Sequence, residues 1–139
     1  MGVRRRGREL ALQMLYQTEL SGASLAQIMA SFEELHTAPE GASSFATSLV
    51  QGVLAHLGEL DEHIASHADN WRLERMAAVD RNVLRLALYE LVHEPGTPPA
   101  VVIDEAVELA KRFGSEQSGK FVNGILDGFA HRTRASGES

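Results

Sequence analysis

Apolar residues recur along this chain at the spacing of an α-helix, and no stretch alternates in the way a β-strand does. The spacing is clearest at Leu25, Ile28, Met29, Phe32 and Leu35, which follow one another at helical intervals. Similar stripes predict seven helices, over about residues 4–20, 25–35, 45–57, 59–68, 80–92, 99–113 and 116–133. The pattern therefore predicts an all-α fold.

Glycine, proline and serine residues mark the expected ends of these helices. Segment 36–43 contains a proline and a glycine, and we expect it to be a loop. Gly58 is expected to interrupt the helical pattern before residues 59–68, and Pro99 suits a first helical turn. The remaining signals are two helix-ending glycines and three capping serines: Gly22, Gly114, Ser24, Ser44 and Ser115.

Composition excludes several classes of protein. The chain has 139 residues, 44% of them hydrophobic, which is enough for one domain or for two small subdomains. It has no cysteine, which excludes disulfides, a thiolate nucleophile and a cysteine zinc site, and which suits a reducing cytoplasm. No apolar run approaches the roughly 20 residues that span a bilayer, and the N-terminus does not read as a secretory signal. We expect a cytoplasmic protein with no membrane contact.

Positive charge is concentrated at one end of an acidic chain. Arg4, Arg5, Arg6 and Arg8 lie within the first eight residues, and no further lysine or arginine occurs before Arg72. Since the formal net charge is −6 and the first eight residues contribute +4, the rest of the chain carries −10. Such an acidic body repels nucleic acid, so a polyanion is expected to bind locally at the basic end.

The position of the arginines at the start of a helix favours RNA binding. Cations are unfavourable at the positive end of a helix dipole, whereas phosphates are attracted to guanidinium groups and to the first N–H groups of the helix. On a helical wheel Arg5 and Tyr16 lie about 20° apart, with Gln13 beside them. An aromatic ring and an amide next to arginines can stack on and hydrogen-bond to single-stranded bases. The sequence thus predicts a nucleic-acid site that favours RNA over DNA.

The opposing interpretation is structural. The arginines could form a solvated basic tail while Tyr16 packs in the core, and the protein would then be a helical scaffold that binds other proteins. Segment 74–85 alternates acids and arginines, and Glu74, Asp80 and Arg81 suit either a docking face for a basic partner or a solvated start of a helix. Composition does not decide between a docking face and a solvated helix start for this segment.

No motif predicts an enzyme, a metal or a cofactor. Segment 114–121 nearly spells a phosphate-binding loop, but Phe121 replaces the hydroxyl that binds magnesium, and a helix precedes the loop where a strand is required. Lys120 could still lend its charge to an anion. His63 and His67 are spaced to share a metal ion, yet two solvated histidines on an acidic helix are the simpler interpretation. The other histidines show no partner spacing.

Three segments carry a family resemblance: residues 4–17 (RRRGRELALQMLYQ), 78–91 (AVDRNVLRLALYEL) and 102–126 (VIDEAVELAKRFGSEQSGKFVNGIL). In these segments the chain resembles the NusB family of bacterial transcription antitermination factors, nearly from end to end. The resemblance implies two perpendicular three-helix subdomains, over about residues 1–70 and 71–134, with a frayed tail at 135–139. Whether such a protein is a homodimer when unbound stays open.

The resemblance also implies a function without catalysis. It implies binding to the boxA element of nascent ribosomal RNA leader transcripts, as a heterodimer with the ribosomal small-subunit protein NusE, within the antitermination complex of RNA polymerase. The arginine-rich motif of the family falls on Arg4, Arg5, Arg6 and Arg8, and its RNA-facing tyrosine on Tyr16. Its second RNA patch falls on Gln117, Lys120 and Phe121, and its partner-facing acid on Asp80.

The chain departs from the family pattern at two positions. Gly7 interrupts the arginines where a better helix former is usual, so we expect this segment to become ordered on RNA. Gln117 stands where the family often carries an acid.

Overall fold

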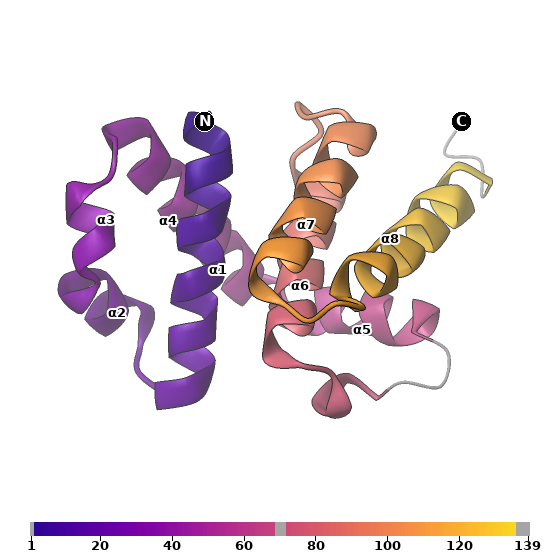
Figure 1. The fold of residues 1–139 in the computed structure, drawn as a ribbon, viewed down its shortest axis with the longest axis horizontal. Coiled ribbons are helices and arrows are strands. Elements are labelled where there is room, and N and C mark those ends of the chain that lie inside the picture. Colours follow the sequence, from indigo (N-terminus) through magenta and orange to yellow (C-terminus); the bar gives the residue numbers. More distant parts are fainter. Residues whose placement is uncertain (1, 69–71, 136–139) are drawn as a thin grey trace. The chain divides into compact units, whose positions relative to one another are not determined.

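The computed structural model describes residues 2–68 and 72–135, and these residues confirm the all-α prediction. They form eight α-helices and one short 3₁₀-helix, with no strand in these two ranges (Figure 1). The chain divides into two compact units, Met1–Ala55 and His56–Ser139. No helix among the described residues is long and apolar enough to cross a membrane.

The first unit contains four helices: α1 (Val3–Ser21), α2 (Leu25–Ser31), α3 (Glu33–Thr37) and α4 (Glu40–Ala55). Its main packing is between α1 and α4. The apolar stripes of these two helices form the core of the unit. The following side chains are almost wholly buried there: Leu10, Met14, Leu49, Val50 and Val53. Burial of such side chains contributes about 1.5–3 kcal/mol each relative to an exposed position.

The second unit contains α5 (Leu57–His67), the 3₁₀-helix η1 (Leu73–Arg75), α6 (Ala78–His93), α7 (Pro99–Phe113) and α8 (Ser118–Ala135). Helix α6 contacts α5, α7 and α8, and the middle of α6 is buried, as its apolar run predicts. The largest fully buried side chains of this unit are Leu60, Ile64, Val83, Leu84, Leu88, Val102 and Leu126.

The division between the units differs from the expected boundary near residue 70. Helix α5 contacts α6 and α8, so it belongs to the second unit, and the division falls between Ala55 and His56. Residues 69–71 lie outside the described residues, as do residues 136–139 of the tail that we expected to be frayed.

Several helix ends correct the pattern-based boundaries. The helix predicted over residues 25–35 is two helices, because the backbone of Phe32 is extended (φ −84°, ψ 98°) and the Ser31 hydroxyl bonds to the carbonyl oxygen of Gln27. The predicted loop at 36–43 is largely helical, because α4 already begins at Glu40. The carbonyl oxygen of Pro39, directly before it, accepts hydrogen bonds from the N–H groups of Ala42 and Ser43. The predicted break at Gly58 occurs instead at His56 (φ −119°, ψ 23°).

Other helix ends agree with the predictions from the sequence. Ser24 forms a capping box with Gln27 at the start of α2. Gly22 ends α1 in the left-handed conformation (φ 73°), and its N–H donates to the carbonyl of Thr18. Pro99 occupies the first turn of α7. These positions are set by local chemistry, which explains why the pattern located them.

Candidate nucleic-acid interface

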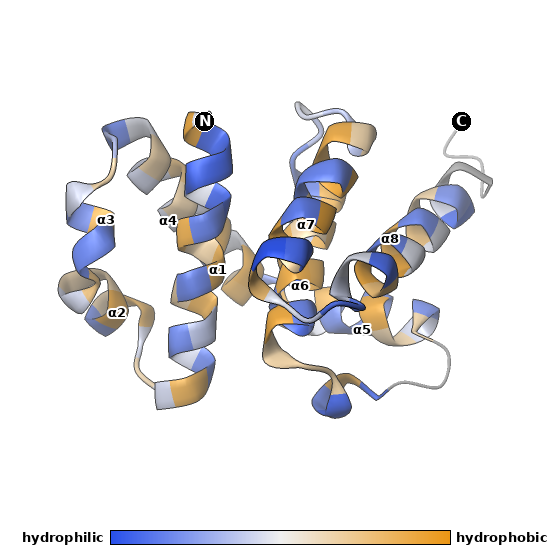
Figure 2. Ribbon diagram, viewed as in Figure 1, coloured by the Kyte–Doolittle hydropathy of each residue, from blue (hydrophilic) through white to orange (hydrophobic). Residues whose placement is uncertain are grey.

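The four N-terminal arginines lie on the first two turns of α1, where Figure 2 shows a hydrophilic band at the start of the helix. This first turn contains no acid, and no side chain caps it at Gly2, so its N–H groups add to the positive potential. Arg4 and Arg5 are exposed, Arg6 is half-buried and Arg8 is buried. Of the four predicted RNA contacts, the structure therefore presents Arg4 and Arg5 most openly.

Phe45 on α4 forms a platform for this cluster. The guanidinium carbon of Arg4 lies 4.5 Å from the centre of the Phe45 ring, and that of Arg8 lies 5.4 Å from it. Both distances are within the range of a cation–π interaction, about 6 Å. The sequence pattern predicted only that Phe45 begins a helix over about residues 45–57, because nothing local indicates that α4 packs beside the start of α1.

Gly7 has a packing role that the sequence did not indicate. A Cβ atom at this position would lie 2.7 Å from Cδ2 of Phe45 and 3.1 Å from the carbonyl oxygen of Ala42. Only glycine therefore allows α1 to approach α4 this closely. In the structure α1 begins at Val3, so Gly7 lies within the helix.

Arg6 stabilises the helix that carries the cluster. Its Nη1 donates a 3.2 Å hydrogen bond to Oε1 of Glu9, a side chain only 3% exposed. A buried carboxylate is costly unless cations or donors balance its charge. Replacing Arg6 would therefore disturb folding as well as any contact with RNA, and the residue is a poor choice for a test of binding alone.

Tyr16 and Gln13 lie further along α1. The Tyr16 ring is exposed (40%), as stacking on a base requires. The side-chain oxygen of Gln13 is buried and has no hydrogen-bond partner in the structure. Glu9 and Leu12, which lie between Arg5 and Tyr16 on the same side of the helix, are buried. The predicted stripe is thus two separate exposed positions rather than one continuous surface.

In the second unit, a cavity of about 250 Å³ brings together two groups predicted from the sequence. It contains Asp80, the expected partner-facing acid, and Gln117 and Phe121 of the expected second RNA patch. The other lining residues are Arg75, Met76, Ala77 and Ser115. Oδ1 of Asp80 is buried and has no hydrogen-bond partner in the structure, which is uncommon for a buried carboxylate oxygen.

The other two residues expected to contact a protein partner, Arg81 and Glu74, differ in their surroundings. Nη1 of Arg81 donates to the carbonyl oxygens of Leu73 (3.0 Å) and Met76 (2.9 Å), so Arg81 holds η1 against the start of α6. Oε2 of Glu74 lies 4.0 Å from Nη1 of Arg72, and both side chains are 73% exposed. Glu74 is open to a partner, whereas Arg81 has a structural role.

The connection from α7 to α8 corrects a predicted cap. Ser115 does not cap the last helix, which begins at Ser118. The Ser115 N–H donates instead to the buried hydroxyl of Ser118, at 2.9 Å. Gln117 and Lys120 are exposed at this end of α8. The segment thus offers an amide and an ammonium group near the start of a helix, an arrangement that suits an anion.

Comparisons with known proteins show the family to which the chain belongs. A family model described as the NusB family matches residues 5–131. The chain belongs to the NusB family.

Relatives and solved structures support the assignment. The transcription antitermination protein NusB of Sorangium cellulosum is 54% identical over 131 residues, covering 94% of this chain and 93% of that protein. The structure of T. maritima NusB has 44% identity and a TM-score of 0.83, covering 92% of this chain and 90% of that one. A crystal structure of antitermination factors NusB and NusE in complex with dsRNA contains a similar chain, with 31% identity and a TM-score of 0.85. That match covers 95% of this chain and 98% of the other.

Proposed function

We propose that this NusB-family protein is a transcription antitermination factor that binds boxA-type single-stranded RNA of ribosomal RNA leader transcripts. The observation that carries the proposal is the pair of exposed arginines at the uncapped start of α1, in a chain that is otherwise acidic. Guanidinium groups and N–H groups both attract phosphate, so their positive charge becomes favourable when RNA binds. The protein has no catalytic step in this role.

A second part of the proposal concerns the protein partner. NusB and NusE occur together with dsRNA in a solved relative. Exposed Glu74 and the unsatisfied oxygen of Asp80 suit a basic partner surface. We infer that the chain binds a NusE-type ribosomal small-subunit protein through Glu74 and Asp80, and that the pair joins RNA polymerase in the cytoplasm.

A titration with labelled RNA tests the function. We expect the protein to bind a short boxA-type single strand more tightly than a scrambled strand, and to bind it more tightly again with NusE present. A duplex of the same sequence is the third ligand, because the relative's structure contains dsRNA. Binding of NusE with no RNA affinity, alone or in the pair, would favour the helical-scaffold interpretation and contradict the proposal.

The Phe45 platform gives a prediction for RNA affinity. Phe45→Leu keeps an apolar side chain but removes the ring face beneath Arg4 and Arg8. The ring holds exposed Arg4 and buried Arg8 in the orientation that we expect RNA to require, and two such contacts of about 0.5 kcal/mol each correspond to roughly a fivefold loss of RNA affinity. Phe113→Leu is the matched control, because it removes a similar contact with Arg112 in the second unit. An equal loss in both variants, measured by fluorescence anisotropy, would show that Phe45 has no special role.

A further inference from the structure

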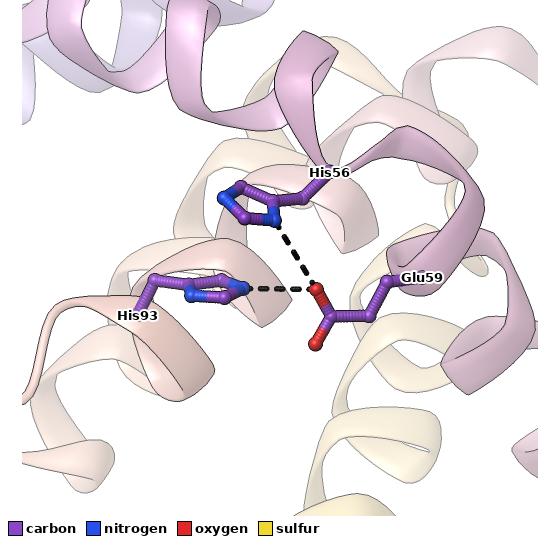
Figure 3. A group of neighbouring side chains, drawn as sticks. All are labelled: His56, Glu59 and His93. Atoms are coloured by element: carbon purple, nitrogen blue, oxygen red, sulfur yellow. Dashed lines mark hydrogen bonds and ion pairs between the residues drawn. The ribbon is translucent and has the colours of Figure 1, made fainter.

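Three side chains of the second unit, none of which is expected to bind RNA, converge on one another: His56, Glu59 and His93 (Figure 3). His56 lies at the turn before α5, Glu59 in the first turn of α5 and His93 in the last turn of α6. Their nitrogen and oxygen atoms all lie within 4.8 Å of one another. No sequence spacing indicated this cluster, since α6 is needed to bring His93 next to the start of α5.

Both imidazoles point to the same carboxylate oxygen. Nε2 of His93 lies 3.0 Å from Oε1 of Glu59, and Nδ1 of His56 lies 3.4 Å from it (Figure 3). Zinc binds histidine nitrogen and carboxylate oxygen at about 2.0–2.2 Å in a tetrahedron, which places neighbouring ligand atoms roughly 3.4 Å apart. The two nitrogen–oxygen separations are close to that value, and the two nitrogen atoms lie within 4.8 Å of each other, so rotation of the side chains can bring all three atoms onto one ion.

The rings are already held in position. The imidazoles of His56 and His93 are stacked, with centroids 4.0 Å apart, and Tyr89 stacks on His93 at 5.3 Å. The Tyr89 hydroxyl donates to Oε2 of Glu94 at 3.4 Å, which fixes that ring in turn. A site whose ligands are oriented in advance loses less entropy when it binds an ion.

A third histidine, His63, lies beside the Glu59 carboxylate. Nε2 of His63 lies 3.9 Å from the second carboxylate oxygen and helps to orient it. The side chains of the three converging residues are 27–42% exposed, so an ion can enter from solvent and keep water in its open position.

We propose that His56, Glu59 and His93 bind one Zn²⁺ ion, with water as the remaining ligand. Two imidazoles and one carboxylate suit zinc and do not suit Mg²⁺ or Ca²⁺, which prefer sets of oxygen ligands. The ion would join the start of α5 to the end of α6 within the second unit. The pair His63 and His67 is not the site proposed here, because no third histidine or acid gathers with this pair among the described residues.

Metal titration of the untagged full chain tests the site, because a histidine tag would itself bind zinc. After treatment with a chelator, we expect one equivalent of Zn²⁺ by calorimetry and a rise in Tm with added Zn²⁺ but not with Mg²⁺. Co²⁺ should give the visible absorption of a tetrahedral site. His93→Gln and Glu59→Gln should each weaken binding by about tenfold or more, whereas His131→Gln, on an exposed histidine of α8, should leave it unchanged.

Two outcomes would overturn the zinc proposal. One is the absence of saturable binding by the wild-type chain. The other is binding that survives both His93→Gln and Glu59→Gln, because the ion would then lie elsewhere. Circular dichroism shows whether each variant is folded, and both should keep wild-type affinity for boxA-type RNA without metal. The zinc site can therefore fail while the RNA function stands, and the reverse also holds.

Discussion

The double variant Arg4→Gln, Arg5→Gln should bind boxA-type RNA about 100-fold more weakly than the wild-type chain. Both side chains are exposed at the start of α1, and glutamine keeps a polar side chain with good helix propensity. Two lost charge-assisted hydrogen bonds of about 1.5 kcal/mol each account for that factor. Fluorescence anisotropy with a short labelled strand measures the loss, and circular dichroism should show unchanged helicity.

The salt dependence of binding separates a charge effect from a change of shape. If the two exposed arginines each neutralise one phosphate of a single strand, they contribute about −1.4 to the slope of log affinity against log salt, and the double variant should lose this contribution. The double variant Arg72→Gln, Lys111→Gln is the charge-matched control, because the two side chains are 73% and 63% exposed and lie in the other unit. An affinity independent of salt, or an equal loss in the control, would contradict a local phosphate site.

Gly7→Ala should lower the free energy of unfolding by about 1–2 kcal/mol. Alanine improves the helix propensity of α1 by nearly 1 kcal/mol, but its methyl group would lie 2.7 Å from the Phe45 ring and 3.1 Å from a backbone carbonyl. Overpacking of this kind costs about 1–3 kcal/mol, and a backbone atom cannot move aside as a flexible side chain can. We expect the steric cost to win, and urea unfolding measures it.

Gly124→Ala is the matched control for Gly7→Ala. Gly124 lies inside α8, and a Cβ atom there would meet nothing within 4 Å. The same substitution should therefore raise the free energy of unfolding by about 0.5–1 kcal/mol. The two variants should move in opposite directions, and a gain of stability at Gly7 would show that α1 and α4 are not as closely packed as the structure indicates.

The sequence predicted those features of the fold that depend on neighbours along the chain. The stripe in α6 and the local signals at Ser24, Gly22 and Pro99 each act through residues within one or two turns, so their helices were found. The break at Phe32 was missed because the apolar stripe continues through it, and periodicity cannot register a single extended residue. The early start of α4 was missed because Pro39 is as typical of a loop as of the residue before a helix.

The candidate site was predicted less completely, for a physical reason. Arg4, Arg5 and Tyr16 could be named from charge and from the helical wheel, and all three are exposed. The platform at Phe45 and the histidine cluster depend on which helices pack together. Such contacts between distant residues leave no periodic signal in one sequence. The burial of Arg8 could not be predicted either, because the sequence does not show which arginine of the cluster faces a neighbouring helix.

A two-dimensional NMR titration locates the RNA on the molecule most directly. With isotope-labelled protein and unlabelled boxA-type RNA, the backbone amides of residues 4–8 and the arginine Nε–H signals should shift most, together with the signals of Phe45. Large shifts confined to residues outside the first two turns of α1, with the arginine signals unmoved at saturation, would contradict an RNA site at the basic start of this helix.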